Sequence, residues 1–258
     1  MARAYFGTDG VRGIVGDELT AALVERLGRA FALWSRGQAV LVGRDTRASG
    51  PELERALASG LADGGADALL GGVLPTAAVA LLADGGGAVV SASHNPAEYN
   101  GVKFFEGGAK LSDWDEEAVE ALLDAPGSTG GSVAEVEGLA DRYAELVAER
   151  FGGPLGGLRV VLDCANGALS AIAPGVFERL GADVVAIADT PDGTNINAGC
   201  GATDLGLLAR AVAERDAALG LAFDGDGDRM LAVDGDGSAV DGDQLLALLA
   251  LYLGVELV

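Results

Sequence analysis

Short apolar runs alternate with helical patterns along almost all of this 258-residue chain, and that alternation limits the possible folds more than any other feature. Residues 39–42, 67–70 and 159–163 are apolar runs of strand length, and each is followed by a helical pattern. Strands that alternate with helices are typical of α/β domains, in which helices cover the faces of a sheet. The sequence therefore predicts α/β/α domains with mixed, mostly parallel sheets.

A change of pattern near the middle of the chain predicts a domain boundary. Residues 125–132 read APGSTGGS, which is typical of a flexible crossing, and a helical pattern follows over residues 139–150. The glycine-rich stretch 151–157 then precedes a second series of strands and helices. We therefore predict two similar domains, residues 1–152 and residues 153–258, each with functional loops beyond the carboxyl ends of parallel strands.

Capping residues and apolar runs predict several helices. Thr20 is placed to cap a helix that reaches about residue 35, while Pro51 and Pro75 each suit the first turn of a helix. The apolar run Leu245–Val255 is too short to cross a bilayer, so we interpret it as a buried helix.

The balance of charge excludes some classes of partner. The formal net charge at pH 7 is −22. Such a chain repels nucleic acid and anionic membranes, so neither is an expected partner. It also repels a phosphorylated substrate, so any phosphate site has to be built locally from the 17 lysine and arginine residues.

The two cysteines predict neither a metal site nor an oxidising compartment. Cys164 and Cys200 are far apart in the sequence and match no metal-binding spacing, so we expect structural or free thiols. Residues 1–9 contain no apolar segment of the kind found in signal peptides. We therefore expect a protein of the reducing cytoplasm.

The first loop with chemical potential is Ser91-Ala92-Ser93-His94-Asn95-Pro96, which directly follows an apolar strand. A strand end can present a nucleophile, and His94 is the only histidine of the chain. Adjacent serine and histidine side chains seldom face each other well enough to form a hydrolase pair. Two interpretations stay open, a nucleophile loop and a polar turn closed by Asn-Pro.

The second such loop also follows an apolar strand, and it contains Asp224, Asp226 and Asp228 separated by glycines. Three carboxylates at alternating positions can turn toward one centre, where a hard cation such as Mg²⁺ would offset their repulsion. Arg229, the next residue, adds a fixed positive charge that can bind phosphate or a carboxylate. The loop is thus a candidate metal site.

Three other interpretations of this loop compete with a metal site. An EF-hand is excluded, because its required glycine and glutamate positions hold Arg229 and Gly235. A phosphatase that uses Asp224 as its nucleophile fits the position after a strand. A simple Asp-Gly turn is the third, and we predict such a hairpin turn for the neighbouring residues 234–237.

Two further segments carry the ingredients of an anion site, and one lysine stands alone in an apolar strand. Residues 7–13 include Thr8 and Arg12, and residues 43–47 include Arg44, so each segment combines glycine, hydroxyl and guanidinium groups. Each can equally be an ordinary charged loop. Lys103 follows the Ser93 loop and is either a functional group or a charge on an edge strand.

These motifs, taken in order, resemble those of the α-D-phosphohexomutase superfamily over essentially the whole chain. The opening residues 5–13 resemble its phosphoglucosamine mutase branch, and residues 91–96 resemble its phosphoserine loop. The remaining matches are residues 100–105, 163–168, 195–197, 201–204 and 224–229. Any one motif is weak, but the ordered set is specific.

The resemblance implies roles for the residues that match. Ser93 would carry a phosphate, which would bind Mg²⁺ together with Asp224, Asp226 and Asp228. The resemblance places His94 and Lys103 beside the transferred phosphoryl group, with Lys103 as the better general acid/base. Arg12 and Arg229 would stabilise charge there, and Thr8 and Arg44 are further candidates for binding phosphate or substrate.

The resemblance also implies a reaction, the interconversion of glucosamine 6-phosphate and glucosamine 1-phosphate. Phosphoserine gives its phosphate to the sugar, a sugar bisphosphate turns over as intermediate, and the other phosphate returns to Ser93. A sugar bisphosphate would therefore also activate the enzyme. A phosphoglucomutase or phosphomannomutase of the same superfamily is the alternative.

The resemblance covers only part of such an enzyme, since members of the superfamily have four domains and two are expected here. The third domain reads the sugar, and the fourth binds the distal phosphate. We expect a half-enzyme with little turnover alone, which pairs with itself or with a complementary C-terminal half. A fragment that only binds a partner is the non-enzymatic alternative.

Overall fold

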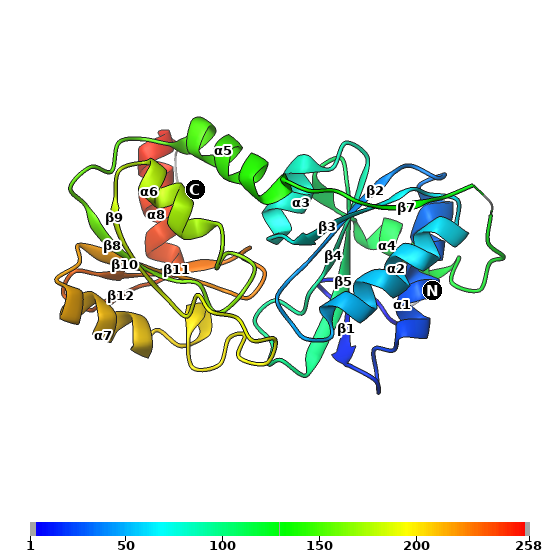
Figure 1. The fold of residues 1–258 in the computed structure, drawn as a ribbon, viewed down its shortest axis with the longest axis horizontal. Helices are drawn as coiled ribbons and strands as arrows, with labels where there is room; N and C mark the ends of the chain where they lie inside the picture. The colour runs from blue at the N-terminus through cyan, green and yellow to red at the C-terminus, as the bar shows by residue number, and fades with distance from the viewer. Residues whose placement is uncertain (1–3, 129, 256–258) are drawn as a thin grey trace.

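Two separate β-sheets organise the chain in the computed structural model, which describes residues 4–128 and 130–255 (Figure 1). The first sheet has the order β1-β5-β4-β2-β3-β7, and β6 pairs with β5. Its strands β2, β3, β4 and β7 are joined by parallel pairs, while β5 runs antiparallel to its neighbours. The strands are β1 (Val11–Ile14), β2 (Val40–Arg44), β3 (Ala68–Val73), β4 (Gly86–Val90), β5 (Tyr99–Glu106), β6 (Ala109–Lys110) and β7 (Val133–Glu135).

Helices cover both faces of this first sheet because its central strands are apolar on both sides. Val40 and Val42 of β2 pack in one core with α1, α2 and α4, whereas Leu41 packs in another core with α3 and α5. Alternate residues of a strand point to opposite faces, so this division follows from the pleat. The helices are α1 (Ala21–Trp34), α2 (Gly50–Asp63), α3 (Thr76–Leu82), α4 (Asp113–Glu120) and α5 (Leu139–Phe151).

The second sheet has the order β12-β11-β10-β8-β9, with parallel pairs between β8 and both β9 and β10. One face packs on α5 and α6 and the other on α7, while a short 3-10 helix (Gly201–Thr203) lies beside β10. These elements are β8 (Arg159–Asp163), β9 (Asp183–Ile187), β10 (Leu219–Phe223), β11 (Met230–Asp234), β12 (Ala239–Val240), α6 (Ala173–Arg179), α7 (Gly206–Arg215) and α8 (Gly242–Leu253).

The prediction of α/β/α domains with mixed sheets is therefore confirmed. The predicted cap is present, since Thr20 Oγ1 accepts a hydrogen bond from the Leu23 N–H at 3.2 Å. The predicted turn at residues 234–237 joins the antiparallel strands β11 and β12. Of the predicted crossing 125–132, residue 129 lies outside the described residues.

Each sheet with the helices that cover it forms one lobe of the molecule. Helix α5 lies along both lobes, as Figure 1 shows. Leu139 packs in the core under the first sheet, whereas Ala144 and Val147 pack in a core of the second. Because one helix serves both cores, the packing itself does not mark a sharp division. The boundary after residue 152 stays a prediction.

The prediction of a buried C-terminal helix is wrong. Helix α8 forms as expected, and Asp241 and Gln244 cap its first turn reciprocally, but α8 contains no buried residue. Leu251 is 77% exposed and Tyr252 87% exposed. The apolar sequence predicts a helix, but a helix is buried only where other elements cover its apolar side chains. In the described chain α8 packs mainly on β11, so most of its surface stays exposed. No helix of the described residues is both long and apolar enough to cross a membrane.

Candidate active site

The two loops singled out by sequence meet where the two lobes face each other. The Ser93 loop leaves the carboxyl end of β4, and residues 224–229 leave the carboxyl end of β10. The Ser93 hydroxyl donates a hydrogen bond to Asp224 Oδ2 at 2.6 Å. Both strands belong to the parallel part of their sheets, so the loops lie where functional loops of α/β domains are expected.

Ser93 is fully buried and its backbone is in the left-handed region, with φ of +53°. Its N–H donates to Ser91 Oγ at 2.8 Å. Its carbonyl accepts from Arg47 Nη2 at 3.0 Å and from Asn197 Nδ2 at 2.9 Å. A residue with a Cβ atom seldom adopts this conformation, so the surrounding hydrogen bonds hold Ser93 in place.

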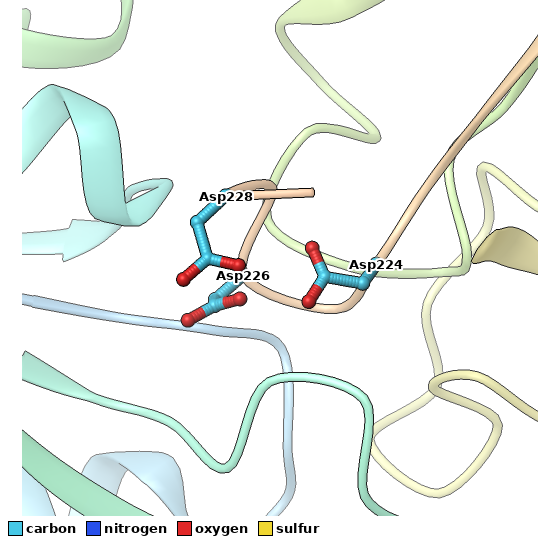
Figure 2. Close-up of side chains that lie close together, drawn as sticks. All are labelled: Asp224, Asp226 and Asp228. Carbon is cyan, nitrogen blue, oxygen red and sulfur yellow. The ribbon is translucent and has the colours of Figure 1, made fainter. Parts of the chain in front are cut away.

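The three aspartates of the second loop face one another, as Figure 2 shows. Asp224, Asp226 and Asp228 each offer one carboxylate oxygen, and these oxygens lie within 4.8 Å of one another. Gly225 permits the loops to approach, because a Cβ atom there would lie 2.6 Å from the Ser93 carbonyl oxygen. The alternation of aspartate and glycine thus produces both the cluster and its contact with Ser93.

The donor set fits a hard divalent cation such as Mg²⁺. Asp226 is fully buried, and its Oδ1 atom has no hydrogen-bond partner among the described residues. A buried carboxylate oxygen without a partner is costly, and a cation would satisfy it. Oxygen ligands in a negative cluster are those that Mg²⁺ prefers. Asp224, Asp226 and Asp228 could therefore hold the ion.

Lys103 lies in the interior of the first sheet and extends to this cluster. Its side chain is almost fully buried, and Nζ lies 2.8 Å from Asp226 Oδ2, 3.0 Å from Asp228 Oδ2 and 3.0 Å from Asp9 Oδ2. Its strand β5 pairs with β1 on one side and β4 on the other. The alternative of an edge-strand charge is therefore wrong.

Burial and neighbouring charge act in opposite directions on these ionisable groups. Burial, strengthened by the charge of Asp226, raises the pKa of Asp224 to about 7. Burial also acts to raise the pKa of Asp226, but the Lys103 ammonium outweighs it and lowers that pKa. Burial acts to lower the pKa of Lys103, and the carboxylates of Asp226 and Asp228 reverse this and raise it. Lys103 is therefore held as an ammonium ion.

Arg229 bridges the two loops. Its Nη2 donates to Ser93 Oγ at 2.6 Å and contacts His94 Nδ1 at 2.7 Å. Partial burial first, and then the charges of Arg229 and Arg12, lower the pKa of His94. The ring is thus neutral near pH 7, and the network assigns Nδ1 as the acceptor. Since Nδ1 receives Arg229 and lies 3.4 Å from Ser93 Oγ, the geometry does not support a serine–histidine hydrolase pair.

Arg12 and Thr8 lie at the rim of the cluster. Arg12 forms an ion pair with Asp9, and its Nη1 lies 3.5 Å from Asn95 Oδ1. Thr8 is exposed and lines, together with Arg12, a small pocket of about 170 Å³. Both residues therefore border the site without touching the three aspartates that define it.

Arg44 does not join the cluster. Its Nε donates to Glu54 at 3.1 Å, and it lines a different pocket with Glu54 and Leu70. Arg47, three residues further on, is fully buried and reaches the Ser93 loop instead. Arg44 therefore pairs with Glu54 away from the three aspartates.

Sequence reasoning missed several supporting residues. Asp9 lies in the segment 7–13, where the sequence points only to Thr8 and Arg12, and Asn197 lies in the motif 195–197, for which the sequence indicates no role. Thr76 gave no signal at all, yet its hydroxyl donates to Asp226 Oδ2 at 2.8 Å and its N–H to the Asp226 carbonyl at 2.9 Å. These contacts link the start of α3 to the aspartate loop of the other lobe.

A larger pocket opens beside the cluster. Its volume is about 620 Å³, which is in the range of small-molecule sites. One wall carries His94, Asp224 and Arg229, and another carries Leu245 and Leu249 of α8. The pocket therefore lies against His94 and Arg229, the two side chains that contact Ser93 Oγ, although Ser93 itself does not line it.

Known proteins are similar to this chain in sequence. Residues 3–129 match the family description "Phosphoglucomutase/phosphomannomutase, alpha/beta/alpha domain I", and residues 141–237 match domain II of the same family. The phosphoglucosamine mutase of Carboxydothermus hydrogenoformans is 49% identical over 96% of this chain and 60% of its own length. That of Thermobifida fusca is 50% identical over 96% of this chain and 59% of its own length.

A solved structure agrees with these sequence matches. A phosphoglucomutase/phosphomannomutase family protein from Burkholderia thailandensis superposes with a TM-score of 0.86 at 33% identity. The superposition covers 96% of this chain and 58% of that protein. The chain thus spans about three fifths of the length of the relatives that it matches.

Proposed function

Because the chain belongs to the phosphoglucomutase/phosphomannomutase family, of which it carries domains I and II, we propose that it performs the phosphoryl-transfer part of a phosphoglucosamine mutase reaction. The curated relatives at about 49% identity are named phosphoglucosamine mutases. Glucosamine 6-phosphate and glucosamine 1-phosphate would be the substrate and product. The proposal concerns phosphoryl transfer, and sugar selection is not assigned to residues of this chain.

One observation carries the proposal, namely that a buried serine hydroxyl lies between a guanidinium group and a carboxylate cluster. Ser93 Oγ is 2.6 Å from Asp224 Oδ2 and 2.6 Å from Arg229 Nη2. Phosphoryl transfer needs positioning and charge neutralisation more than it needs covalent machinery. The cluster supplies both in a site largely closed to water.

In the proposed reaction a phosphoryl group moves between Ser93 and a sugar hydroxyl. The hydroxyl oxygen attacks the phosphorus on Ser93, the P–Oγ bond breaks, the hydroxyl loses its proton and Oγ gains one. The sugar bisphosphate then returns its other phosphate to Ser93 by the same chemistry in reverse. The enzyme ends phosphorylated as it began, and the sugar leaves as its positional isomer.

The residues around Ser93 have separate roles in this proposal. Asp224, Asp226 and Asp228 would hold Mg²⁺ with a phosphate oxygen on Ser93, and the ion would neutralise charge on the phosphoryl oxygens. Arg229 binds the same oxygens, and Arg12 approaches from the rim. Lys103 stays protonated among its carboxylates, so it would supply a fixed positive charge beside the transferred phosphoryl group.

The same site supports a second candidate within the family and weakens a third from outside it. The family description names phosphoglucomutase and phosphomannomutase, so these activities are the second candidate. A phosphatase with an Asp224 nucleophile is less well supported. The curated relatives at about 49% identity are named phosphoglucosamine mutases, and the Asp224 carboxylate faces those of Asp226 and Asp228 as part of the candidate cation site.

The proposal is tested by the intact mass of the purified chain after incubation with Mg²⁺ and glucosamine 1,6-bisphosphate. We expect one added phosphate, mapped to Ser93. Asp224→Asn should slow its appearance by at least about a hundredfold, since it removes a carboxylate from the reacting centre. Asp236→Asn, the same change in the exposed hairpin turn, is the matched control and should leave the rate unchanged.

The outcomes separate the candidates. Equal or faster phosphorylation by glucose 1,6-bisphosphate would favour the phosphoglucomutase assignment. Phosphate on Asp224 in place of Ser93 would favour the phosphatase. A chain that takes no phosphate under any of these conditions would refute phosphoryl transfer by this chain and favour a role in binding a partner.

A further inference from the structure

We propose that Asp45, Arg47 and Ser91 form a positioning network that holds Ser93 in its left-handed conformation and so directs the Ser93 hydroxyl at Asp224. We call these three residues the Asp45 network. The inference rests on the proposed function in one respect only, the role of Ser93 as the phosphate carrier. All three side chains are buried.

The Asp45 carboxylate is the centre of the network. Its Oδ1 accepts the Arg47 N–H at 3.0 Å, and its Oδ2 accepts Arg47 Nε at 2.9 Å and the Ser91 hydroxyl at 2.6 Å. The Asp45 and Arg47 side chains have no solvent exposure. A buried ion pair is stable only where its remaining hydrogen-bonding groups are also satisfied, which fixes the geometry of everything it contacts.

Ser91 connects the Asp45 carboxylate to the backbone N–H of Ser93. The Ser91 hydroxyl gives its only proton to Asp45, so its oxygen is left as an acceptor. That oxygen accepts the Ser93 N–H at 2.8 Å. Ser91 Oγ is the hydrogen-bond partner of this N–H in the described chain, so the contact decides where the backbone of Ser93 begins its turn.

Arg47 acts on the carbonyl side of the same residue. Its two terminal nitrogens donate to Ser93 O at 3.0 Å, Asn95 O at 2.8 Å and Tyr99 O at 2.9 Å, and also to Pro96 O. A planar guanidinium offers five donors in a fixed fork, which a lysine cannot reproduce. One side chain thus fixes three carbonyl groups of the Ser93 loop and the Tyr99 carbonyl at the start of β5.

The two arms hold Ser93 from both sides, and that is what a left-handed serine requires. Such a backbone is disfavoured for residues with a Cβ atom and persists where the surroundings over-determine it. Asn197 from the other lobe also donates to the Ser93 carbonyl, at 2.9 Å. The nitrogen side therefore depends on Ser91 alone, which makes Ser91 the position at which the network can be tested.

The test compares Ser91→Ala with the wild-type chain in two measurements. The first is the set of backbone NMR chemical shifts of Ser93, which differ between left-handed and extended conformations. The second is the rate of Ser93 phosphorylation by glucosamine 1,6-bisphosphate with Mg²⁺. We expect the shifts of Ser93 to leave the left-handed range and the rate to fall on the order of a hundredfold, because small displacements of a reacting atom have such effects.

Two further variants accompany it. Ser170→Ala is the matched control, because Ser170 Oγ is buried without a partner among the described residues, and it should change neither measurement. Asp45→Asn keeps the size of the side chain but replaces a carboxylate oxygen by an amide, and it should reproduce Ser91→Ala. It also covers the case in which Ser91→Ala fails to fold.

The two measurements distinguish the network from the proposed function. Unchanged shifts of Ser93 in the folded variants would overturn the network, whatever the activity. Shifts that change while the phosphorylation rate does not would overturn its positioning role. A wild-type chain with a left-handed Ser93 that accepts no phosphate would refute the proposed function, and the shift comparison would still decide the network.

Discussion

The formal charges around Ser93 nearly cancel. Asp9, Asp224, Asp226 and Asp228 face Arg12, Lys103 and Arg229, so four acids meet three bases. A phosphate on Ser93 adds about two negative charges, which a divalent cation would offset. In the proposed function, phosphorylation of Ser93 and binding of a cation would therefore favour each other.

Burial gives the two cysteines a testable property that does not depend on the site. Burial raises the pKa of Cys164 to about 12 and that of Cys200 to about 11. The thiolate is the reactive form, so both cysteines should be inert at pH 8. We expect iodoacetamide to modify them at least about a hundredfold more slowly in the folded chain than in urea, as measured by intact mass.

The same shifts fix the sign of a pH dependence. A thiol whose pKa is raised on folding contributes stability that is complete below its unfolded value of about 8.5 and is lost as pH rises through the folded value. Between pH 9 and 11 each thiol should lower the free energy of unfolding by up to about 1.4 kcal/mol per pH unit. Cys164→Ala should show a shallower decline, and an equal slope in both proteins would contradict the prediction.

The sequence predicts the functional residues at strand ends, but it does not predict which neighbouring side chains hold them in place. Ser93, Asp224 and Lys103 follow or lie within apolar runs, where a polar residue needs a reason. Arg44 and Arg47 lie in one segment, and nothing local distinguishes them. The difference arises from tertiary structure, because Arg44 meets Glu54, whereas Arg47 meets carbonyls about 50 residues away in the sequence.

At the level of elements, local signals located the helices better than the edges of the sheets. Thr20 marks the start of α1 by capping it, and Pro51 marks the start of α2 by its fixed φ in the first turn, so both signals act within one turn. The helix after β8 begins only at Ala173, because Pro174 lies in its first turn and the preceding residues form turns. The edge strand β7 was not predicted, since it is short and exposed and takes its order from pairing with β3.

The pairing of α1 with α2 depends on glycine and gives an element-scale prediction. A Cβ atom at Gly60 of α2 would lie 1.8 Å from the Glu25 carbonyl oxygen of α1, so Gly60→Ala forces the helices apart. Gly175 of α6 has nothing within 4 Å of such an atom. In urea unfolding we expect Gly60→Ala to lower the free energy of unfolding by about 1–3 kcal/mol.

Gly175→Ala is the matched control, and its effect should have the opposite sign. Alanine removes the entropic cost of glycine in a helix, so we expect a gain of about 0.5–1 kcal/mol. If Gly60→Ala were also stabilising, the close approach of α1 and α2 would not be a determinant of the fold.

For the whole molecule, opposite influences act on self-association. The net charge of −22 keeps copies apart, while α8 presents an exposed apolar surface that includes Leu246, Leu248 and Leu251. Electrostatic repulsion is screened over about 30 Å at 0.01 M salt but over about 3 Å at 1 M. Contact between apolar surfaces depends far less on salt, so salt should decide which influence prevails.

We therefore expect the chain to be largely monomeric in 20 mM salt and to form dimers through α8 in 1 M NaCl, as measured by sedimentation velocity. Leu251→Glu should weaken the dimer at least about tenfold, because burying one leucine contributes about 1.5–3 kcal/mol. Leu81→Glu, at a leucine that is 44% exposed on α3, tests whether any added charge suffices, and it should leave the dimer intact. A chain that stays monomeric at both salt concentrations would show that the apolar surface of α8 is too small to overcome the repulsion. Equal loss of the dimer in the two variants would mean that net charge, rather than α8, governs the association.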